Sequence, residues 1–127
     1  MKLLDTDVLV DVARGYLPAV RWFSTLVLDE VGVPGPVALE VIKGCRNRRE
    51  VDRVQRILNR LPIYWPSAND GTRALESFAD HHLAHNLGIL DALIAECAVG
   101  AGATLITFNV KHFRVIADLR TEQPYQR

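Results

Sequence analysis

The amino-acid sequence predicts a single α/β domain, a three-layer α/β/α arrangement with a short parallel sheet of about four to five strands. Three observations favour this fold class. Short apolar segments alternate along the chain with segments of ten or more residues that have helical periodicity, which is typical of parallel sheets. The length of 127 residues suits one core, so one domain spans residues 1–127. A content of 49% hydrophobic and 24% charged residues is that of a folded globular chain.

Strands are expected where short apolar or β-branched runs end at a turn or at a polar residue. The predicted strands are residues 2–4, 31–33, 63–65, 103–107 and, as a short last strand, 119–122. No internal repeat, low-complexity tract or linker interrupts this succession, which supports one continuous domain.

Three helices are predicted in the first half of the chain. Residues 5–14 place their apolar side chains on one face, and a glycine ends that helix. A second helix opens at Leu17, with Val20 and Val27 among the apolar side chains expected to face the core. After a Pro-Gly-Pro turn, a third helix carries Glu40.

Three longer helices are predicted in the second half. Residues 46–60 form an amphipathic helix. Ser67 or Asn69 caps the next helix, which runs to about residue 86. Four apolar side chains of that helix are expected in the core: Ala74, Leu75, Phe78 and Leu83. The last helix spans residues 89–99 and ends in a glycine-containing loop.

Charge and composition exclude several classes of protein. The 15 basic residues equal the 15 acidic ones, so any nucleic-acid site must be local. No apolar run approaches the roughly 20 residues of a membrane-spanning helix, and the first residues lack the features of a signal peptide. Cys45 and Cys97 are too few for a disulfide framework. We therefore expect reduced thiols and a cytoplasmic protein.

Four polar side chains gather where the predicted strands end. Asp5 follows the first strand, Glu40 lies on the helix after the second, and Asn109 follows the strand at 103–107. Asp91 occupies the first turn of an otherwise apolar helix. Ligands of open α/β sheets bind outside the carboxyl ends of the strands, so we expect these residues to converge there. Converging carboxylates repel one another, and oxygen ligands suit Mg²⁺ or Mn²⁺, so the pattern predicts a divalent metal site.

Each of these four residues also has a purely structural interpretation. Asp5 is equally well explained as the cap of the first helix, and Asp91 as a common acid of a helix N-terminus. Glu40 alone would be an ordinary surface residue, and Asn109 a turn former. The functional interpretation gains weight only because the predicted topology brings all four to one edge of the sheet.

Four stretches of the sequence together resemble the PIN domain family, and more narrowly the VapC-type toxins of type II toxin–antitoxin systems. These stretches are residues 3–10, Glu40, residues 88–95 and residues 105–113. They occur in the family's order and cover essentially the whole chain. The resemblance implies a PIN-like fold and a metal-dependent endoribonuclease that cuts structured RNA such as tRNA with Mg²⁺ or Mn²⁺. It also implies a cognate antitoxin protein as a partner and a homodimer.

The resemblance assigns catalytic roles to the four polar residues. Asp5, Glu40 and Asp91 match the acidic triad of the family, and Asn109 matches a fourth position that is Asp or Asn in this toxin group. By this assignment Asp5 and Asp91 hold the metal ion, and Glu40 and Asn109 complete its site directly or through water. The ion would orient a water for attack on the RNA phosphate.

Neighbouring residues match supporting positions. Thr6 and Thr107 correspond to polar residues that flank the site, and Asp7 would position the metal ligands. The chain departs from the family at Val37, three residues before Glu40, where many relatives have Ser or Thr. This departure removes one hydrogen bond that would support the glutamate.

Two basic segments are candidates for contact with RNA. Residues 43–60 carry seven basic side chains against two acidic ones, with Arg46 and Arg49 near the start. The same stripe is equally well explained as a solvated helix face, and part of it could meet an antitoxin instead. The second candidate segment contains Lys111, His112 and Arg114.

Other classes of function fit the sequence less well. His81 and His85 share a helix face, but no third zinc ligand follows from the sequence. A dehalogenase-like phosphatase would need Thr or Val where Leu9 stands, and a receiver domain would need an acid where Trp65 stands. A nuclease for DNA flaps would need additional elements. The main alternative is a catalytically silent PIN-like module that binds RNA or protein.

Overall fold

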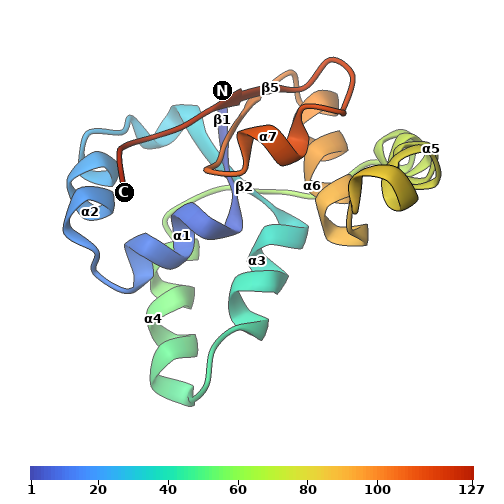
Figure 1. Cartoon of the computed structure of the whole chain (residues 1–127). Helices are drawn as coiled ribbons and strands as arrows, with labels where there is room; N and C mark the ends of the chain where they lie inside the picture. Colours follow the sequence, from blue (N-terminus) through green and yellow to red (C-terminus); the bar gives the residue numbers. More distant parts are fainter.

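The computed structural model describes all 127 residues, and it contains one five-stranded sheet in which every neighbouring pair is parallel (Figure 1). The strands are β1 (Lys2–Leu4), β2 (Val31–Pro34), β3 (Ile63–Tyr64), β4 (Thr104–Ile106) and β5 (Arg120–Glu122). Their order is β3-β2-β1-β4-β5, so β1 lies at the centre, with Leu3 opposite Gly32 on one side and Leu105 on the other. The predicted α/β class and the predicted strands are confirmed.

Seven α-helices and one 3₁₀ helix (Leu28–Glu30) connect the strands. The α-helices are α1 (Thr6–Ala13), α2 (Leu17–Ser24), α3 (Gly35–Lys43), α4 (Arg48–Leu58), α5 (Ala68–His85), α6 (Ile89–Gly100) and α7 (Val110–Phe113). In Figure 1, α1 and α2 lie on one side of β1, and α5 and α6 lie on the other. The 3₁₀ helix and α7 were not predicted, because a single turn is too short to show a helical period. None of the helices is both long enough and apolar enough to cross a membrane.

The carboxyl ends of β1, β2 and β4 emerge at the same edge of the sheet, because these neighbouring strands are parallel. The chain continues from them into α1, into α3, and into a short loop that precedes α7. Helix α3 packs against both α1 and α6, so three helices meet below this edge. Leu3, Leu4 and Leu105 are fully buried in the sheet, which makes its edge a rigid support for whatever side chains follow.

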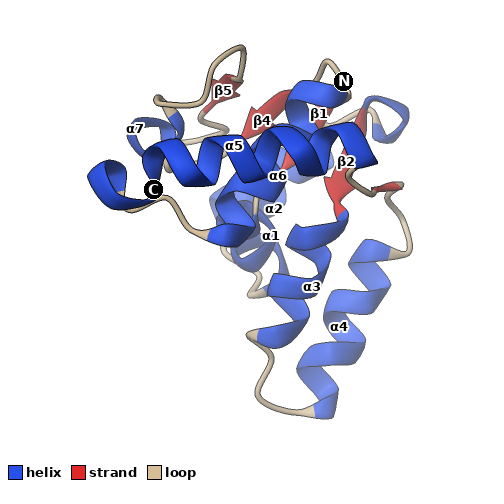
Figure 2. Ribbon diagram, turned by 90° about the vertical axis from the view of Figure 1, so that its right-hand side faces the viewer, coloured by secondary structure: helices blue, strands red, loops and turns tan.

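Helix α4 begins two residues later than predicted. The side chain of Asn47 accepts a hydrogen bond from the backbone N–H of Glu50 at 2.9 Å and so caps the helix, which leaves Arg46 outside it. Helix α4 packs on α3 and α1. Together, α3 and α4 form an arm that extends away from the sheet (Figure 2).

The prediction for the apolar side chains of α5 is partly wrong. Ala74 is buried, but Leu75 is 69% exposed and Leu83 is 92% exposed. The helix packs on α6 along one narrow face, and these two leucines, eight residues apart, share a different face. Of the two candidate caps, Ser67 is the one used: its hydroxyl accepts a hydrogen bond from the N–H of Asp70 at 3.1 Å.

The expected burial of two valines near α2 is also wrong. Val20 and Val27 are both exposed. Val20 lies on the outer face of α2, and Val27 lies beyond the last residue of that helix, where the chain has left helical periodicity. The apolar pattern identified the helix correctly but extended its buried face too far.

Helices α5 and α6 are joined by a buried ion-pair network. Glu96, buried on α6, accepts from Nε of Arg73 at 3.3 Å, and Asp70 accepts from Nη2 of the same arginine at 2.5 Å. The Arg73→Ala variant leaves Glu96 without its cation. We expect a loss of about 2 kcal/mol, less than the roughly 3–5 kcal/mol of a fully buried pair because Arg73 is partly exposed. Urea unfolding measures it, with Arg48→Ala, which removes an exposed pair, as a control that leaves stability nearly unchanged.

Candidate active site

Asp5 is the first residue after β1, and it serves both as a helix cap and as a member of the site. Its Oδ1 accepts a hydrogen bond from the backbone N–H of Thr6 at 2.8 Å, at the start of α1. Its Oδ2 accepts from the hydroxyl of Thr107, after β4, at 2.7 Å. The carboxylate is therefore fixed between two neighbouring strands, and Asp5 is only 5% exposed.

Asp7 holds the loop that follows β4. Its Oδ1 accepts from the backbone N–H of Val8 at 2.8 Å, and its Oδ2 accepts from that of Phe108 at 2.9 Å. The next residue, Asn109, donates its own N–H to the hydroxyl of Thr107 at 3.0 Å. The backbone of Asn109 is thus held by the Thr107 hydroxyl, which also contacts the two aspartates, and the residue is exposed.

Glu40 reaches the site from α3, and the hydroxyl of Thr6 donates a hydrogen bond to its Oε1. This contact replaces the supporting hydrogen bond that Ser or Thr at position 37 would give. Val37 is fully buried in the core and offers no hydrogen bond, but Thr6 supplies one from the neighbouring helix α1. The glutamate is therefore supported, although not by the residue three positions before it.

Asp91 stands in the first turn of α6, where its Oδ2 accepts from the backbone N–H of Gly88 at 3.1 Å. The same oxygen lies 2.9 Å from Nε2 of His112 on α7. Since an ionised carboxylate only accepts, the histidine donates from Nε2. His112, one of the predicted RNA contacts, lies against Asp91 in this structure.

Burial and nearby negative charges disfavour the ionised form of Asp5. Burial raises the pKa of Asp5 to about 7, and the nearby charges of Asp7 and Glu40 add to the rise, while the hydrogen bonds from Thr107 and Thr6 oppose it. Burial also raises the pKa of Asp7, against hydrogen bonds from Phe108 and Val8. A divalent cation would relieve this repulsion.

The donor set fits a hard cation, although its side chains are not arranged as a finished coordination shell. Asp5, Glu40 and Asp91 offer carboxylate oxygens, the ligands that Mg²⁺ and Mn²⁺ prefer. No three acidic, histidine or cysteine side chains converge closely enough to chelate one ion as they stand. Two of the acids have other partners here: Thr6 holds Glu40, and His112 holds Asp91.

A profile of the PIN domain matches residues 2–119 of the chain. The chain belongs to the PIN domain family. It is homologous to the VapC ribonucleases of toxin–antitoxin systems, as the resemblance of its motifs indicated. The predicted fold and family are both confirmed.

Two curated relatives of this PIN domain come from Mycobacterium tuberculosis. Ribonuclease VapC19 is 30% identical, and the alignment covers 98% of this chain and 100% of the relative. Ribonuclease VapC10 is 29% identical, and the alignment covers 94% of this chain and 91% of the relative. Among solved structures, a toxin–antitoxin complex from Klebsiella pneumoniae matches with a TM-score of 0.80 and 23% identity, over 100% of both chains.

A groove of about 530 Å³ runs along the PIN domain beside the acids. Thr6 and Glu40 line it, and from them it follows α1 as far as Arg14 and α3 as far as Cys45. Its apolar lining residues are Val10, Ala13, Val41 and Val54, and Arg46, Glu50 and Arg53 add charge. The groove therefore joins the acidic site to the charged arm.

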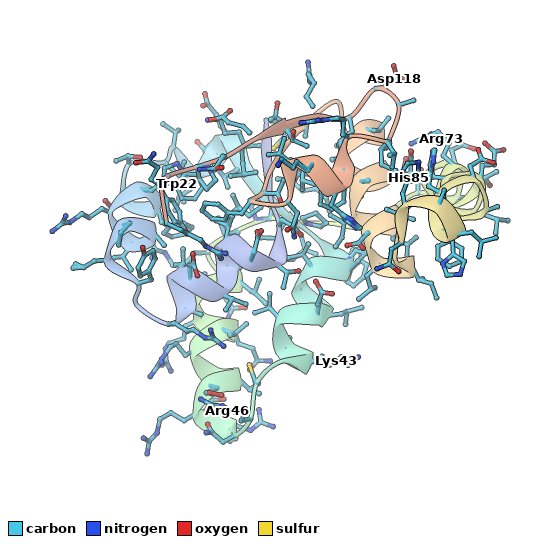
Figure 3. The ribbon with its side chains drawn as sticks, in the orientation of Figure 1. Trp22, Lys43, Arg46, Arg73, His85 and Asp118 are labelled. Carbon is cyan, nitrogen blue, oxygen red and sulfur yellow. The ribbon has the colours of Figure 1, made fainter.

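The predicted RNA-contact residues lie on two sides of the site. Arg46 is at the far end of the arm, between α3 and α4 (Figure 3), and forms an exposed ion pair with Glu50 at 3.3 Å. Arg49 is exposed and forms no ion pair. Lys111 and Arg114 are exposed in and after α7, beside the acids. His81 and His85 have rings 5.5 Å apart on α5, with no third ligand for zinc.

Sequence reasoning missed one charged residue beside the site, Arg127. Its Nη2 donates to the backbone carbonyl of Asp7 at 3.4 Å. Its positive charge also opposes the rise in the pKa of Asp7 that burial causes. No sequence signal indicated this residue, because it is 120 positions away from its contact.

Proposed function

We propose that this PIN domain is the toxin of a type II toxin–antitoxin system, a metal-dependent endoribonuclease that hydrolyses phosphodiester bonds in structured RNA such as tRNA. The observation that carries the proposal is the burial of Asp5 beside Asp7 and Glu40 at the carboxyl edge of the sheet. Such an arrangement opposes ionisation unless a cation joins it, and helix capping by Asp5 does not require two further acids beside it. Homology to proteins named as ribonucleases supports the same activity.

We assign the metal ligands as Asp5 and Asp91, with Glu40 and Asn109 completing the site directly or through water. Bound Mg²⁺ or Mn²⁺ would lower the pKa of a water and offset negative charge on the scissile phosphate. The chain itself fixes the carboxylates: Thr107 orients Asp5, and the hydroxyl of Thr6 orients Glu40.

Two further residues have defined tasks in this proposal. Asp7 holds the backbone of Phe108 and so presents the side chain of Asn109 at the mouth of the site. His112 holds the carboxylate of Asp91 by its Nε2, and this contact must loosen or shift when the acid takes up a ligand role.

Cleavage of a pooled tRNA and rRNA preparation tests the proposal. Purified protein is incubated with Mg²⁺, Mn²⁺ or EDTA, beside the Glu40→Gln variant, which keeps the size of the side chain but removes its charge. Discrete cuts that require the metal and are lost in the variant support the nuclease. A folded protein that binds RNA but never cuts it, with either metal, indicates the silent binding module instead.

We propose that RNA phosphates contact both flanks of the site, through Lys111 and Arg114 beside it and through Arg49 and Arg46 on the arm. Of the two arginines on the arm, Arg46 forms an ion pair with Glu50, whereas Arg49 is exposed and forms none. Replacing Lys111 and Arg114 together by Gln is expected to weaken RNA binding about tenfold and to reduce the steepness of its salt dependence by roughly two phosphate contacts. Fluorescence anisotropy across salt concentrations measures both, with Arg21→Gln on α2 as a control; an unchanged salt slope would contradict the assignment.

A cognate antitoxin is the proposed protein partner, in the cytoplasm where RNA is also found. The similar structure from Klebsiella pneumoniae is described as a toxin–antitoxin complex, which supports such a partner. The groove between α1, α3 and α4 suits a peptide segment, because an apolar floor lies between charged residues. A segment seated there would cover Glu40 and so silence the site.

We also propose that two copies of the chain form a homodimer. Large apolar side chains are exposed on three helices that pack side by side, α3, α6 and α5. They are Leu39, Ile89, Leu75 and Leu83, with Trp65 exposed before α5. A second copy covering this surface would remove it from water. Sedimentation velocity of the chain alone tests the proposal, and a monomer at all concentrations would reject it.

A further inference from the structure

Residues 123–127 cross from β5 to α2, and we call this segment the strap (Figure 1). It lies beyond residues 2–119, the part of the chain that matches the PIN family. The ring of Tyr125, in the strap, packs among three aromatic side chains. Its centre lies 4.9 Å from that of Phe108, 5.9 Å from that of Trp22 and 6.3 Å from that of Tyr16. The strap therefore joins α2 to the loop after β4.

Asp11 on α1 anchors the strap through its carboxylate. Its Oδ2 accepts a hydrogen bond from the Tyr125 hydroxyl at 2.7 Å and another from Nε of Arg127 at 3.0 Å. Burial, together with this hydrogen bond, raises the pKa of the Tyr125 hydroxyl above its usual value, so the hydroxyl keeps its proton and donates. The strap is thus tied to α1 by a charge-assisted contact, which is stronger than one between neutral groups.

Arg127 packs against the loop that contains Phe108 and Asn109. Its guanidinium is 4.2 Å from the centre of the Phe108 ring, and its Nη2 donates to the backbone carbonyl of Asp7. The backbone N–H of Phe108 is bound in turn by the carboxylate of Asp7. Phe108 is therefore held from two sides, with its ring under the strap and its N–H on Asp7.

We infer that the strap positions the catalytic loop: Tyr125 and Arg127 fix Phe108 and Asp7, and through them the backbone that carries Asn109. The inference rests on the proposed nuclease function, because it assigns positioning residues for that reaction. Neither strap residue contacts Asp5, Glu40 or Asp91. Their effect is expected on the placement of groups in the site, where a shift of about 1 Å costs on the order of 100-fold in rate.

Two kinds of measurement test the strap, and the first does not depend on activity. Hydrogen exchange of the Phe108 and Asn109 amides is compared between the wild type and the Tyr125→Phe/Arg127→Gln double variant. We expect at least about tenfold faster exchange at these two amides and no change in α5, because opening is local. Arg120→Gln is the matched control: it removes a cation near the same end of the chain, where Arg120 bonds the carbonyl of Gly102 far from the loop.

The second measurement is the kinetics of RNA cleavage. Each single variant is expected to lower kcat by about tenfold with little change in KM, as for other residues that support metal ligands. The double variant should be little worse than either single one, because both residues are anchored on Asp11 and both hold the same ring, Phe108. Arg127→Lys should recover part of the rate, since it keeps the charge near Asp11 and Phe108 but loses the planar contact.

Three results would overturn the inference. Unchanged exchange at Phe108 and Asn109 would show that the strap does not hold the loop, whatever the protein does to RNA. A rise in KM alone, with kcat preserved, would make Arg127 a direct contact for RNA. A loss of activity that matches a loss of folded protein would reduce the strap to a stabilising segment. Altered exchange in a protein that cuts no RNA would instead contradict the proposed function and leave the positioning of the loop in place.

Discussion

Replacing Asp5 with asparagine is expected to abolish RNA cleavage and, at the same time, to make the metal-free protein more stable at pH 8. The activity falls because the change removes a proposed metal ligand, and we expect a loss of at least about 100-fold. The stability rises because the wild-type carboxylate must be ionised at pH 8 while buried beside Asp7 and Glu40. The pKa shift of Asp5 corresponds to about 4 kcal/mol, and we expect a gain on the order of 2 kcal/mol in the free energy of unfolding, because the amide must also rearrange the contacts with Thr6 and Thr107.

The two opposite changes separate this prediction from simple damage to the fold. Urea unfolding in EDTA measures the gain, which should shrink at pH 5, where the wild-type carboxyl is largely protonated. The exposed acid Asp29 gives a matched control, because Asp29→Asn removes the same charge far from the site and should change neither property. A variant that cleaves normally, or that is inactive only because it unfolds, would contradict the assignment of Asp5.

The position of the acids could be predicted from sequence because it depends on topology more than on detailed packing. Asp5 and Asn109 follow predicted strands within a few residues, Glu40 lies on the helix that follows β2, and Asp91 lies in the first turn of α6. Parallel pairing of neighbouring strands then brings their carboxyl ends together. The structural interpretation of Asp5 and Asp91 is confirmed, since each accepts a hydrogen bond from a backbone N–H at the start of a helix, while their catalytic role stays a proposal.

The partners of these acids were harder to predict, because they depend on distant side chains. The contact between Thr6 and Glu40 compensates for Val37, and it joins α1 to α3 across 34 positions of sequence. His112 was grouped with Lys111 and Arg114 because all three are basic, yet its ring turns toward Asp91. Spacing along the chain carries no information about which of several neighbouring basic residues turns inward.

Surface features were missed for a related reason. A helix period shows that a helix has an apolar side, but it does not say how wide a strip its neighbour covers. On α5 the strip includes Ala74 and excludes Leu75 and Leu83. Contacts of the strap, such as Tyr125 with Asp11, link residues 114 positions apart, so they follow only from the assembled fold.

The stability of the metal-free protein is expected to fall as the pH rises from 5 to 8. The pKa of Asp5 is 3.8 in the unfolded chain and about 7 in the folded protein. Between these values the folded state keeps a proton that the unfolded state has released, so each rise in pH favours unfolding. The stabilisation is fully present below pH 3.8 and is lost as the pH passes through 7. Between pH 3.8 and 7, the contribution of Asp5 to the free energy of unfolding changes by about 4 kcal/mol.

Metal binding should follow the opposite trend, because the ion needs the ionised carboxylate. Affinity for Mn²⁺ is expected to rise between pH 5 and 7 and to level off above it, with about one proton released per ion at the lower pH values. Calorimetric titrations in two buffers of different ionisation enthalpy count that proton, and urea unfolding in EDTA follows stability over the same range. In Asp5→Asn, the contribution of this carboxyl to the pH dependence of stability and of Mn²⁺ affinity should disappear. If Mn²⁺ binds with the same affinity and proton release in the variant, the ion is held elsewhere and the buried aspartate is not its ligand.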